Sequence, residues 1–226
     1  MRWDWIWSCP YDNEGWKVWM EDQIGKVTLQ TLWEQKVEGC TRCRLHETRQ
    51  NIVFGAGNTE QPDFLFLGEG PGANEDAKAE PFVGPAGKLL DKILYHMNYK
   101  RQDVYICNVI SCRPPGNRDP KADELEACAS VWSTQVMAVR PRMIIALGRF
   151  SGNALLGTKG QSIVQMRKKI HTWNRIPVQV TYHPAGMLRN EDYKQPAWDD
   201  LQKAMQRLKE IKKYATDAGP LFGGEA

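Results

Sequence analysis

The chain has 226 residues, of which 42% are hydrophobic and 25% are charged, so it can bury one sizeable core, and its length favours one large domain over two small ones. The 30 basic and 27 acidic residues give a net charge of +3, which indicates a nucleic-acid-binding protein only if the basic groups cluster on one face. The sequence shows neither the roughly 20 apolar residues of a membrane span nor a signal peptide. We therefore expect an intracellular, cytoplasmic protein that does not bind membranes.

Residues 1–26 form an N-terminal extension that contains five of the nine tryptophans. They are Trp3, Trp5, Trp7, Trp16 and Trp19. Such a segment most often packs on the main body, but it could also stack on bases or contact a partner protein. We assign residues 27–215 to the main domain and residues 216–226 to a C-terminal tail.

Short apolar runs alternate with amphipathic stretches from residue 63 onward. The apolar runs predict strands within 64–67, 104–110, 143–147 and 178–181, and the spacing between them predicts helices near 86–97, 121–139, 150–156 and 197–214. Strands that alternate with helices indicate an α/β domain with a mostly parallel sheet covered on both faces. Functional residues of such folds gather at the carboxyl ends of the strands.

A glycine-rich segment follows the first predicted strand, and Gly68 to Ala73 matches the dinucleotide pattern G-x-G-x-x-A. A dinucleotide site needs a helix that starts on the glycines, whereas we expect about a dozen loop residues and two prolines before the helix at Ala86. We therefore predict no nucleotide cofactor. The loop could instead bring backbone amides close to a ligand, with Phe82 against a planar group, or it could be a tight turn with a core phenylalanine.

Four cysteines have the spacing of a metal site. Cys40 and Cys43 form a C-x-x-C pair, and Cys112 and Cys128 lie 16 positions apart. Four thiolates suit a tetrahedral zinc ion or a 4Fe–4S cluster, and a chance set of buried cysteines is a third interpretation. Cys107 lies in a predicted core strand, where a small buried side chain is expected.

Two further polar residues are candidates for the site: His183, after a predicted strand, and Asn108, within one. His183 follows the fourth strand and precedes Pro184, so we expect a loop to present its ring rather than a helix. Asn108 is an amide in an otherwise apolar strand, which costs free energy unless its donors and acceptor are used.

Taken together, these motifs resemble the family 4 uracil-DNA glycosylases. The resemblance runs from about residue 39 to 190 and keeps the order and spacing of the motifs, which include the four cysteines, the glycine-rich loop, Phe82, Asn108 and His183. It also includes the segments 112–118 and 145–148. The joint pattern is far more specific than any of its parts.

This resemblance implies a three-layer α/β/α domain with a four-stranded parallel sheet. It implies a 4Fe–4S cluster on Cys40, Cys43, Cys112 and Cys128, with zinc as the alternative occupant. Phe82 would stack on a flipped uracil, Asn108 would bond its O4 and N3 edge, and His183 would face O2. Gly68, Glu69, Gly70 and Glu75 would shape the pocket or position the attacking water, with Glu69, Glu75 and Asp76 as candidates for activating it.

The resemblance also implies contacts with duplex DNA. The loop from Pro184 to Arg189 would press into the duplex, with Met187 or Leu188 as the wedge that fills the vacated space. Arg118 is a further candidate for DNA contact. The basic run at 167–171 does not occupy the place of a covalently acting histidine loop found in a related branch, so we interpret it as a phosphate-contacting or merely solvated loop.

The leading hypothesis is a monofunctional, nucleoid-associated hydrolase that acts as a monomer on uracil-containing DNA, releasing uracil and leaving an abasic site for base excision repair. The alternative is a weak or inactive protein that binds uracil or single-stranded DNA on the same fold. An electron carrier that uses the cluster is a third possibility.

Overall fold

The computed structural model describes residues 28–217. The tryptophan-rich extension at 1–26 and residues 218–226 of the predicted tail lie outside the described residues. Within the described part, no helix is long and apolar enough to cross a membrane.

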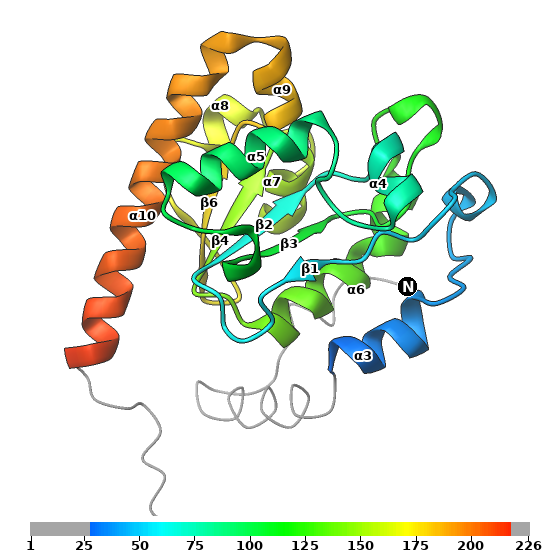
Figure 1. The fold of residues 1–226 in the computed structure, drawn as a ribbon, viewed down its shortest axis with the longest axis horizontal. Helices are drawn as coiled ribbons and strands as arrows, with labels where there is room; N and C mark the ends of the chain where they lie inside the picture. The colour runs from blue at the N-terminus through cyan, green and yellow to red at the C-terminus, as the bar shows by residue number, and fades with distance from the viewer. Residues whose placement is uncertain (1–27, 218–226) are drawn as a thin grey trace, which may run out of the picture.

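One sheet of six strands forms the centre of the molecule (Figure 1), with the strand order β1-β3-β2-β4-β6-β5. The four central strands run parallel to one another: β2 (Phe64–Gly68), β3 (Tyr105–Asn108), β4 (Met143–Leu147) and β6 (Ile176–Thr181). The two edge strands, β1 (Ala56–Gly57) and β5 (His171–Trp173), are short and antiparallel. The α/β class and the four parallel strands are confirmed, and the edge strands extend the sheet beyond them.

Alternation along the strands divides the core into two apolar layers, because successive side chains of a strand point to opposite faces. Phe64 and Phe66 of β2 join one layer, whereas Leu65 and Leu67 join the other. Every residue of β2 and β4 is buried. These runs are therefore continuously apolar, as expected for strands covered on both faces.

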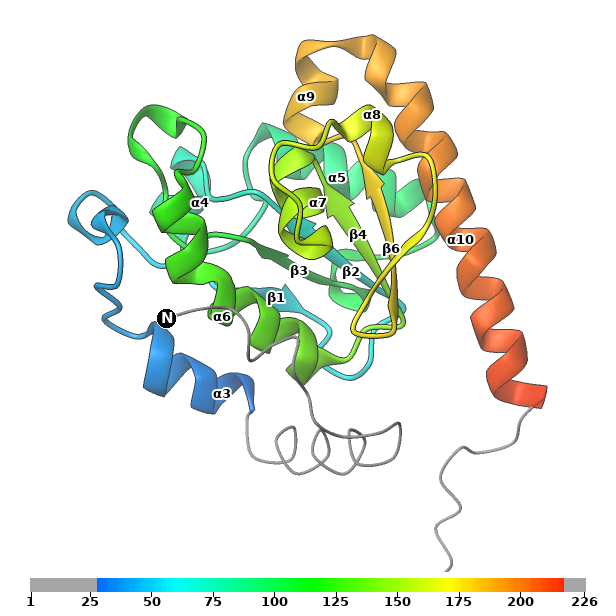
Figure 2. The ribbon, with the colours of Figure 1, turned by 180° about the vertical axis from the view of Figure 1, so that it is seen from behind.

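Helices cover both layers, as the two opposite views show (Figures 1 and 2). Helices α5 (Pro85–His96) and α10 (Lys194–Asp217) pack on one face, and α6 (Ala122–Val139) and α7 (Arg149–Leu156) pack on the other. All four correspond to predicted helices, and α10 is longer than expected. The remaining elements are short: α3 (Leu29–Leu32), η1 (Trp33–Val37), η2 (Arg44–Glu47), α4 (Ala73–Lys78), η3 (Arg101–Asp103), η4 (Pro115–Asn117), α8 (Ile163–Met166), α9 (Pro184–Arg189) and η5 (Glu191–Tyr193).

Two of these short helices correct the sequence predictions. Helix α4 begins directly after Gly72, so the expectation of about a dozen loop residues before the next helix is wrong. Helix α9 begins at Pro184, so His183 caps a helix rather than lying in a loop. Proline restricts the residue before it but is well tolerated at the first helical position, where its missing N–H has no intrahelical partner to lose.

Candidate active site and cysteine cluster

Residues from four separate segments meet at the carboxyl edge of the sheet. Gly68 and Asn108 end β2 and β3, His183 follows β6, and Phe82 lies between α4 and α5. A Cβ atom on Gly68 would lie 2.3 Å from Oδ1 of Asn108 and 2.6 Å from the ring of Phe82. The ring centroids of Phe82 and His183 are 5.6 Å apart with an interplanar angle of 31°. The structure thus brings these four predicted site residues together, and only a glycine at 68 leaves room for the others.

The backbone of Phe82 is held in an unusual conformation. Its φ is 55°, a left-handed value that is uncommon for a bulky residue and must be maintained by its surroundings. Arg101 donates to the carbonyl of Phe82 at 3.1 Å and also to that of Pro81. A Cβ on Gly87 would lie 1.7 Å from the Phe82 carbonyl oxygen, so a glycine is required there. These contacts fix the ring against Gly68 and His183.

Asn108 presents an unused hydrogen-bond acceptor. The side chain is only 5% exposed, and its Oδ1 has no hydrogen-bond partner within the described residues. An unpaired buried oxygen costs free energy, on the order of 1–3 kcal/mol. Such an atom next to Phe82 and His183 is suited to a ligand that brings a donor.

His183 is neutral and its tautomer is set by the helix that it caps. The backbone N–H of Ala185 donates to Nδ1 at 3.1 Å, so the ring proton of the neutral form resides on Nε2. Burial, assisted by the positive charge of Arg189, lowers the pKa of His183 to about 4. Near neutral pH the ring therefore offers an uncharged Nε2–H donor.

Glu75 and Asp76 brace loops, which corrects their predicted roles. Glu75 accepts the N–H groups of Gly72 at 3.1 Å, Val83 at 2.9 Å and Gly84 at 2.7 Å. Both of its oxygens are thereby committed to joining the glycine-rich loop to the Phe82 loop. Oδ1 of Asp76 accepts the N–H groups of residues 50 and 51 at 3.0 and 3.1 Å. We therefore assign direct contact with substrate or water to neither carboxylate.

Glu69 remains the candidate for positioning water. Burial, with a smaller contribution from Asp119, raises the pKa of its carboxyl to about 7, and the positive charges of Arg149 and Arg189 oppose the rise. The adjacent Gly70 lies against the segment that follows β3, because a Cβ there would be 2.6 Å from Cγ1 of Ile110. Close packing is therefore sufficient to explain the glycine at position 70, and no contact with substrate is needed to explain it.

The segment predicted to enter DNA divides into buried and exposed parts. Met187 is 2% exposed and Leu188 is 49% exposed, so Leu188 is the available wedge and Met187 belongs to the core. Pro184 is also buried, whereas Arg189 is exposed. The assignments of Met187 and Pro184 to direct DNA contact are corrected accordingly.

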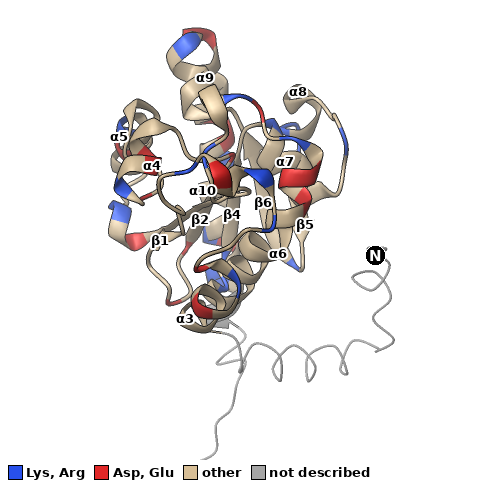
Figure 3. Ribbon diagram, turned by 90° about the vertical axis from the view of Figure 1, so that its right-hand side faces the viewer, with Lys and Arg blue, Asp and Glu red and all other residues tan. Residues whose placement is uncertain are grey.

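The guanidinium of Arg118 also forms hydrogen bonds within the protein. Its guanidinium donates to both carboxylate oxygens of the buried Glu124, at 2.8 and 2.5 Å, and to the carbonyl of Asp119 at 2.9 Å. This pair fastens the 113–119 loop to the first turn of α6, which gives Arg118 a structural role, and its contact with DNA stays a prediction. On the side seen in Figure 3, basic and acidic residues are interspersed, and no single basic face is visible.

The four predicted ligand cysteines gather at one side of α6. Cys43, Cys112 and Cys128 share a small apolar cluster, and Cys40 and Cys43 both act electrostatically on Cys112. Two arginines donate to the thiols: Arg42 Nε to Cys40 Sγ and Arg49 to Cys112 Sγ, each at 3.2 Å. Among residues 28–217, no three His, Cys, Asp or Glu side chains are grouped so as to hold a metal ion.

Sequence reasoning gave no site role to Arg101 or to Gly148, although Gly148 ends the segment 145–148 of the family resemblance. A Cβ on Gly148 would lie 3.1 Å from Cβ of His183, and its φ of 95° also favours glycine. Gly148 follows β4 as Gly68 ends β2, and this shared position at the sheet edge is a signal that could have identified it. Arg101 acts on backbone carbonyls 19 and 20 residues away, and no local motif indicates such a contact.

The sequence is similar to those of known uracil-DNA glycosylases. The family model described as the uracil DNA glycosylase superfamily matches residues 54–202. The type-4 uracil-DNA glycosylase of Saccharolobus solfataricus is 41% identical over 185 residues, covering 78% of this chain and 85% of that protein. The type-4 uracil-DNA glycosylase of Thermotoga maritima is 38% identical over 184 residues, covering 80% and 95%. A type-5 uracil-DNA glycosylase of Pyrobaculum aerophilum is 30% identical over 120 residues, covering 52% and 49%. The chain therefore belongs to the uracil-DNA glycosylase superfamily and, within it, to the type-4 family, which confirms the resemblance.

Proposed function

We propose that this chain hydrolyses the N-glycosidic bond of deoxyuridine in DNA, releasing uracil and leaving an abasic site. The observation that supports it most is the convergence of Phe82, Asn108 and His183 on one place at the sheet edge. All three come from a single chain, so a monomer can form the complete site.

Recognition of uracil follows from the three side chains. A base must leave the stack before water can reach its sugar, which costs a few kcal/mol and is partly offset by stacking in the pocket. Phe82 provides that stacking surface. The unpaired Oδ1 of Asn108 accepts the N3–H of uracil while its NH₂ donates to O4. Cytosine presents an acceptor and a donor in the reverse order, so it leaves the amide mismatched.

Cleavage is assisted where negative charge develops. The departing uracil carries charge on O2, and the neutral Nε2–H of His183 is the donor that stabilises it. One such donor typically contributes about 3 kcal/mol, roughly a hundredfold in rate. A ring with a pKa of about 4 holds its proton on the required nitrogen without the cost of burying a positive charge.

The attacking water is held by Glu69. With a pKa of about 7, its carboxyl is partly ionised near neutral pH and can accept a hydrogen bond from water. Ionisation also stabilises the positive sugar that forms as uracil leaves. Leu188 fills the space vacated by the base, and Arg189 lies next to it to contact the backbone phosphates.

The four cysteines fit a 4Fe–4S cluster. Cys43, Cys112 and Cys128 share one apolar cluster, and four thiolates are the usual ligand set of a 4Fe–4S cluster, with zinc as the alternative occupant. Arg42 and Arg49 donate to two of the sulfurs and would offset the negative charge of the thiolates. When bound, the cluster would supply a covalent link between residues 40–43, the loop at 112 and helix α6.

A duplex oligonucleotide with one uracil, followed by alkali cleavage, tests the proposed function. The wild type should give product, and an intact abasic strand before alkali would show that no lyase step occurs. His183→Ala should lose activity, whereas His96→Ala, which changes an exposed histidine at the end of α5, should keep it. Retention of uracil-containing DNA by the wild type without any product would favour the binding protein instead.

A further inference from the structure

One excursion of the chain carries both His183 and Leu188. The chain leaves the sheet after β6, forms α9 and η5, and returns in α10. The hydroxyl of Thr181, on the outgoing limb, donates to Oδ2 of Asp200, on the returning limb, at 2.9 Å. Both residues are fully buried. A change at this closure would therefore displace the histidine and the wedge relative to the pocket.

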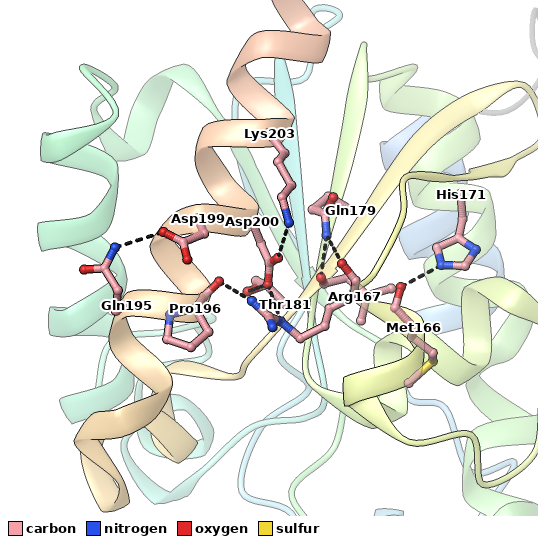
Figure 4. Close-up of polar contacts among 11 residues, drawn as sticks. Met166, Arg167, His171, Gln179, Thr181, Gln195, Pro196, Asp199, Asp200 and Lys203 are labelled. Atoms are coloured by element: carbon pink, nitrogen blue, oxygen red, sulfur yellow. Dashed lines mark hydrogen bonds and ion pairs between the residues drawn. The ribbon is translucent and has the colours of Figure 1, made fainter.

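Arg167 connects to the same closure, which corrects the expectation that the basic run at 167–171 contacts phosphate or is solvated. Its Nε donates to Oδ2 of Asp200 at 2.8 Å, and another guanidinium nitrogen donates to the carbonyl of Pro196 at 2.5 Å (Figure 4). Ring nitrogen Nε2 of His171, at the end of the run, bonds the carbonyl of Met166 at 2.7 Å. Lys168 and Lys169 are exposed, so the correction concerns Arg167 and His171, and the expectation of a phosphate-contacting or solvated loop stays a prediction for the two lysines.

Arg167 also contacts the outgoing limb. Its guanidinium carbon lies 5.2 Å from the ring centroid of Tyr182, and that ring stacks on Tyr193 with centroids 4.3 Å apart and an interplanar angle of 7°. Tyr182 immediately precedes His183. Arg167, which is not part of the excursion, therefore holds it at both ends.

The network of Arg167, Asp200 and Thr181 is better suited to fixing the position of the excursion than to increasing the free energy of unfolding. Asp200 is fully buried, and its other oxygen, Oδ1, has no hydrogen bond within the described part of the chain, with Lys203 Nζ 3.8 Å away. A buried ion pair often contributes little net stability, because desolvation offsets the attraction, but it restricts the arrangements that the chain can adopt. The excursion that carries the reactive groups is where such restriction matters for catalysis.

We propose that Arg167, through Asp200, Thr181 and Tyr182, is a positioning residue that sets His183 over the pocket and Leu188 at the surface. The kinetic part of this proposal rests on the proposed glycosylase function. A displacement of about 1 Å in a catalytic group can reduce a rate by up to a hundredfold, so the effect should appear in the chemical step.

The test compares Arg167→Met, Thr181→Val and Thr181→Ser with the control Lys168→Met, at temperatures where all are folded. We expect Arg167→Met to lower the single-turnover rate by about 30-fold and Thr181→Val by about fivefold, because catalysis is sensitive to small displacements. Thr181→Ser should restore the rate, since it keeps the hydroxyl. The salt dependence of DNA binding should be unchanged in Arg167→Met, whereas loss of a phosphate contact lowers the slope by about 1.

Hydrogen exchange of residues 182–193 provides a readout that does not need activity. Arg167→Met and Thr181→Val should raise exchange there, and Lys168→Met should not. Unchanged exchange together with a wild-type single-turnover rate, or a reduced salt slope equal to that of a phosphate contact, would overturn the proposal. If the wild type itself cleaves nothing, the proposed function fails, and the exchange result still decides whether Arg167 holds the excursion.

Discussion

The pocket and the cysteine cluster differ in whether their polar atoms have hydrogen-bond partners within the protein. At the pocket, Oδ1 of Asn108 is buried without a hydrogen-bond partner among residues 28–217, and Nδ1 of His183 accepts a backbone N–H, which leaves the ring proton on Nε2. At the cysteine cluster, the arginines Arg42 and Arg49 already donate to the thiols. The contrast supports two of the proposals made above: a transient ligand at the pocket, and a permanent metal cluster at the cysteines.

Removing the donor at the pocket should have the largest effect. His183→Ala is expected to lower the single-turnover rate by roughly a hundredfold, because one donor to a developing negative charge contributes about 3 kcal/mol. Rapid-quench measurement at saturating enzyme isolates this step from binding. A rate within threefold of wild type would show that His183 does not face the departing base.

Replacing the unpaired amide should have the next largest effect. Asn108→Leu keeps the approximate volume but offers neither donor nor acceptor, so we expect a loss of about 2 kcal/mol, or roughly 30-fold in kcat/KM. Folding stability should not fall by the same amount, because in the free protein the substitution also removes a buried oxygen that lacks a partner. A large fall in the unfolding midpoint with unchanged kcat/KM would assign Asn108 to the fold instead.

The pH dependence distinguishes Glu69 from His183. Protonation of Glu69 below its pKa of about 7 removes the acceptor for water, so the rate should fall up to tenfold per pH unit below that value. His183, with a pKa of about 4, stays neutral across that range and cannot cause the fall. Glu69→Gln should be slower and should lose this acidic limb, whereas persistence of the limb would assign it to another group.

The cysteine side should respond in stability rather than in chemistry. Arg49→Met removes the donor to Cys112, so we expect iron to be lost several-fold faster to a chelator, as followed by absorbance and iron content. The uracil-excision rate of the fully loaded protein should change less than twofold. The control is Arg44→Met, because Arg44 pairs with the exposed Asp123 rather than with a thiol. Equal chelator rates in both variants would remove Arg49 from the cluster's surroundings.

The strands, the main helices and the shared site of Phe82, Asn108 and His183 were predictable because each depends on a local pattern. Hydrophobic runs mark the buried strands, and their carboxyl ends place Gly68 and His183 at one edge. Asn108 was expected inside the strand at 104–110, whereas it ends β3 in the structure. Helix α9 was missed because a proline was interpreted only as a barrier to the residue before it, not as a first helical residue.

The roles of charged residues could not be predicted in the same way. Arg118 and Glu75 were predicted to contact DNA or substrate, and Arg167 was expected in a phosphate-contacting or solvated loop. In the structure their partners are Glu124, backbone N–H groups and Asp200, respectively. The identity of a charged residue does not reveal whether its side chain faces solvent or forms an ion pair inside the protein. Only the packing of distant segments decides between these outcomes, and the same holds for which of Met187 and Leu188 is exposed.

The most direct test of the uracil pocket is nitrogen NMR of the protein labelled at histidine, with and without uracil and abasic DNA. The account predicts that His183 is neutral at pH 7, with Nδ1 unprotonated and Nε2 protonated, and that the Nε2 signal moves when uracil binds. An imidazolium signal at that pH would contradict the account. So would a neutral ring whose Nε2 chemical shift does not change at saturating uracil.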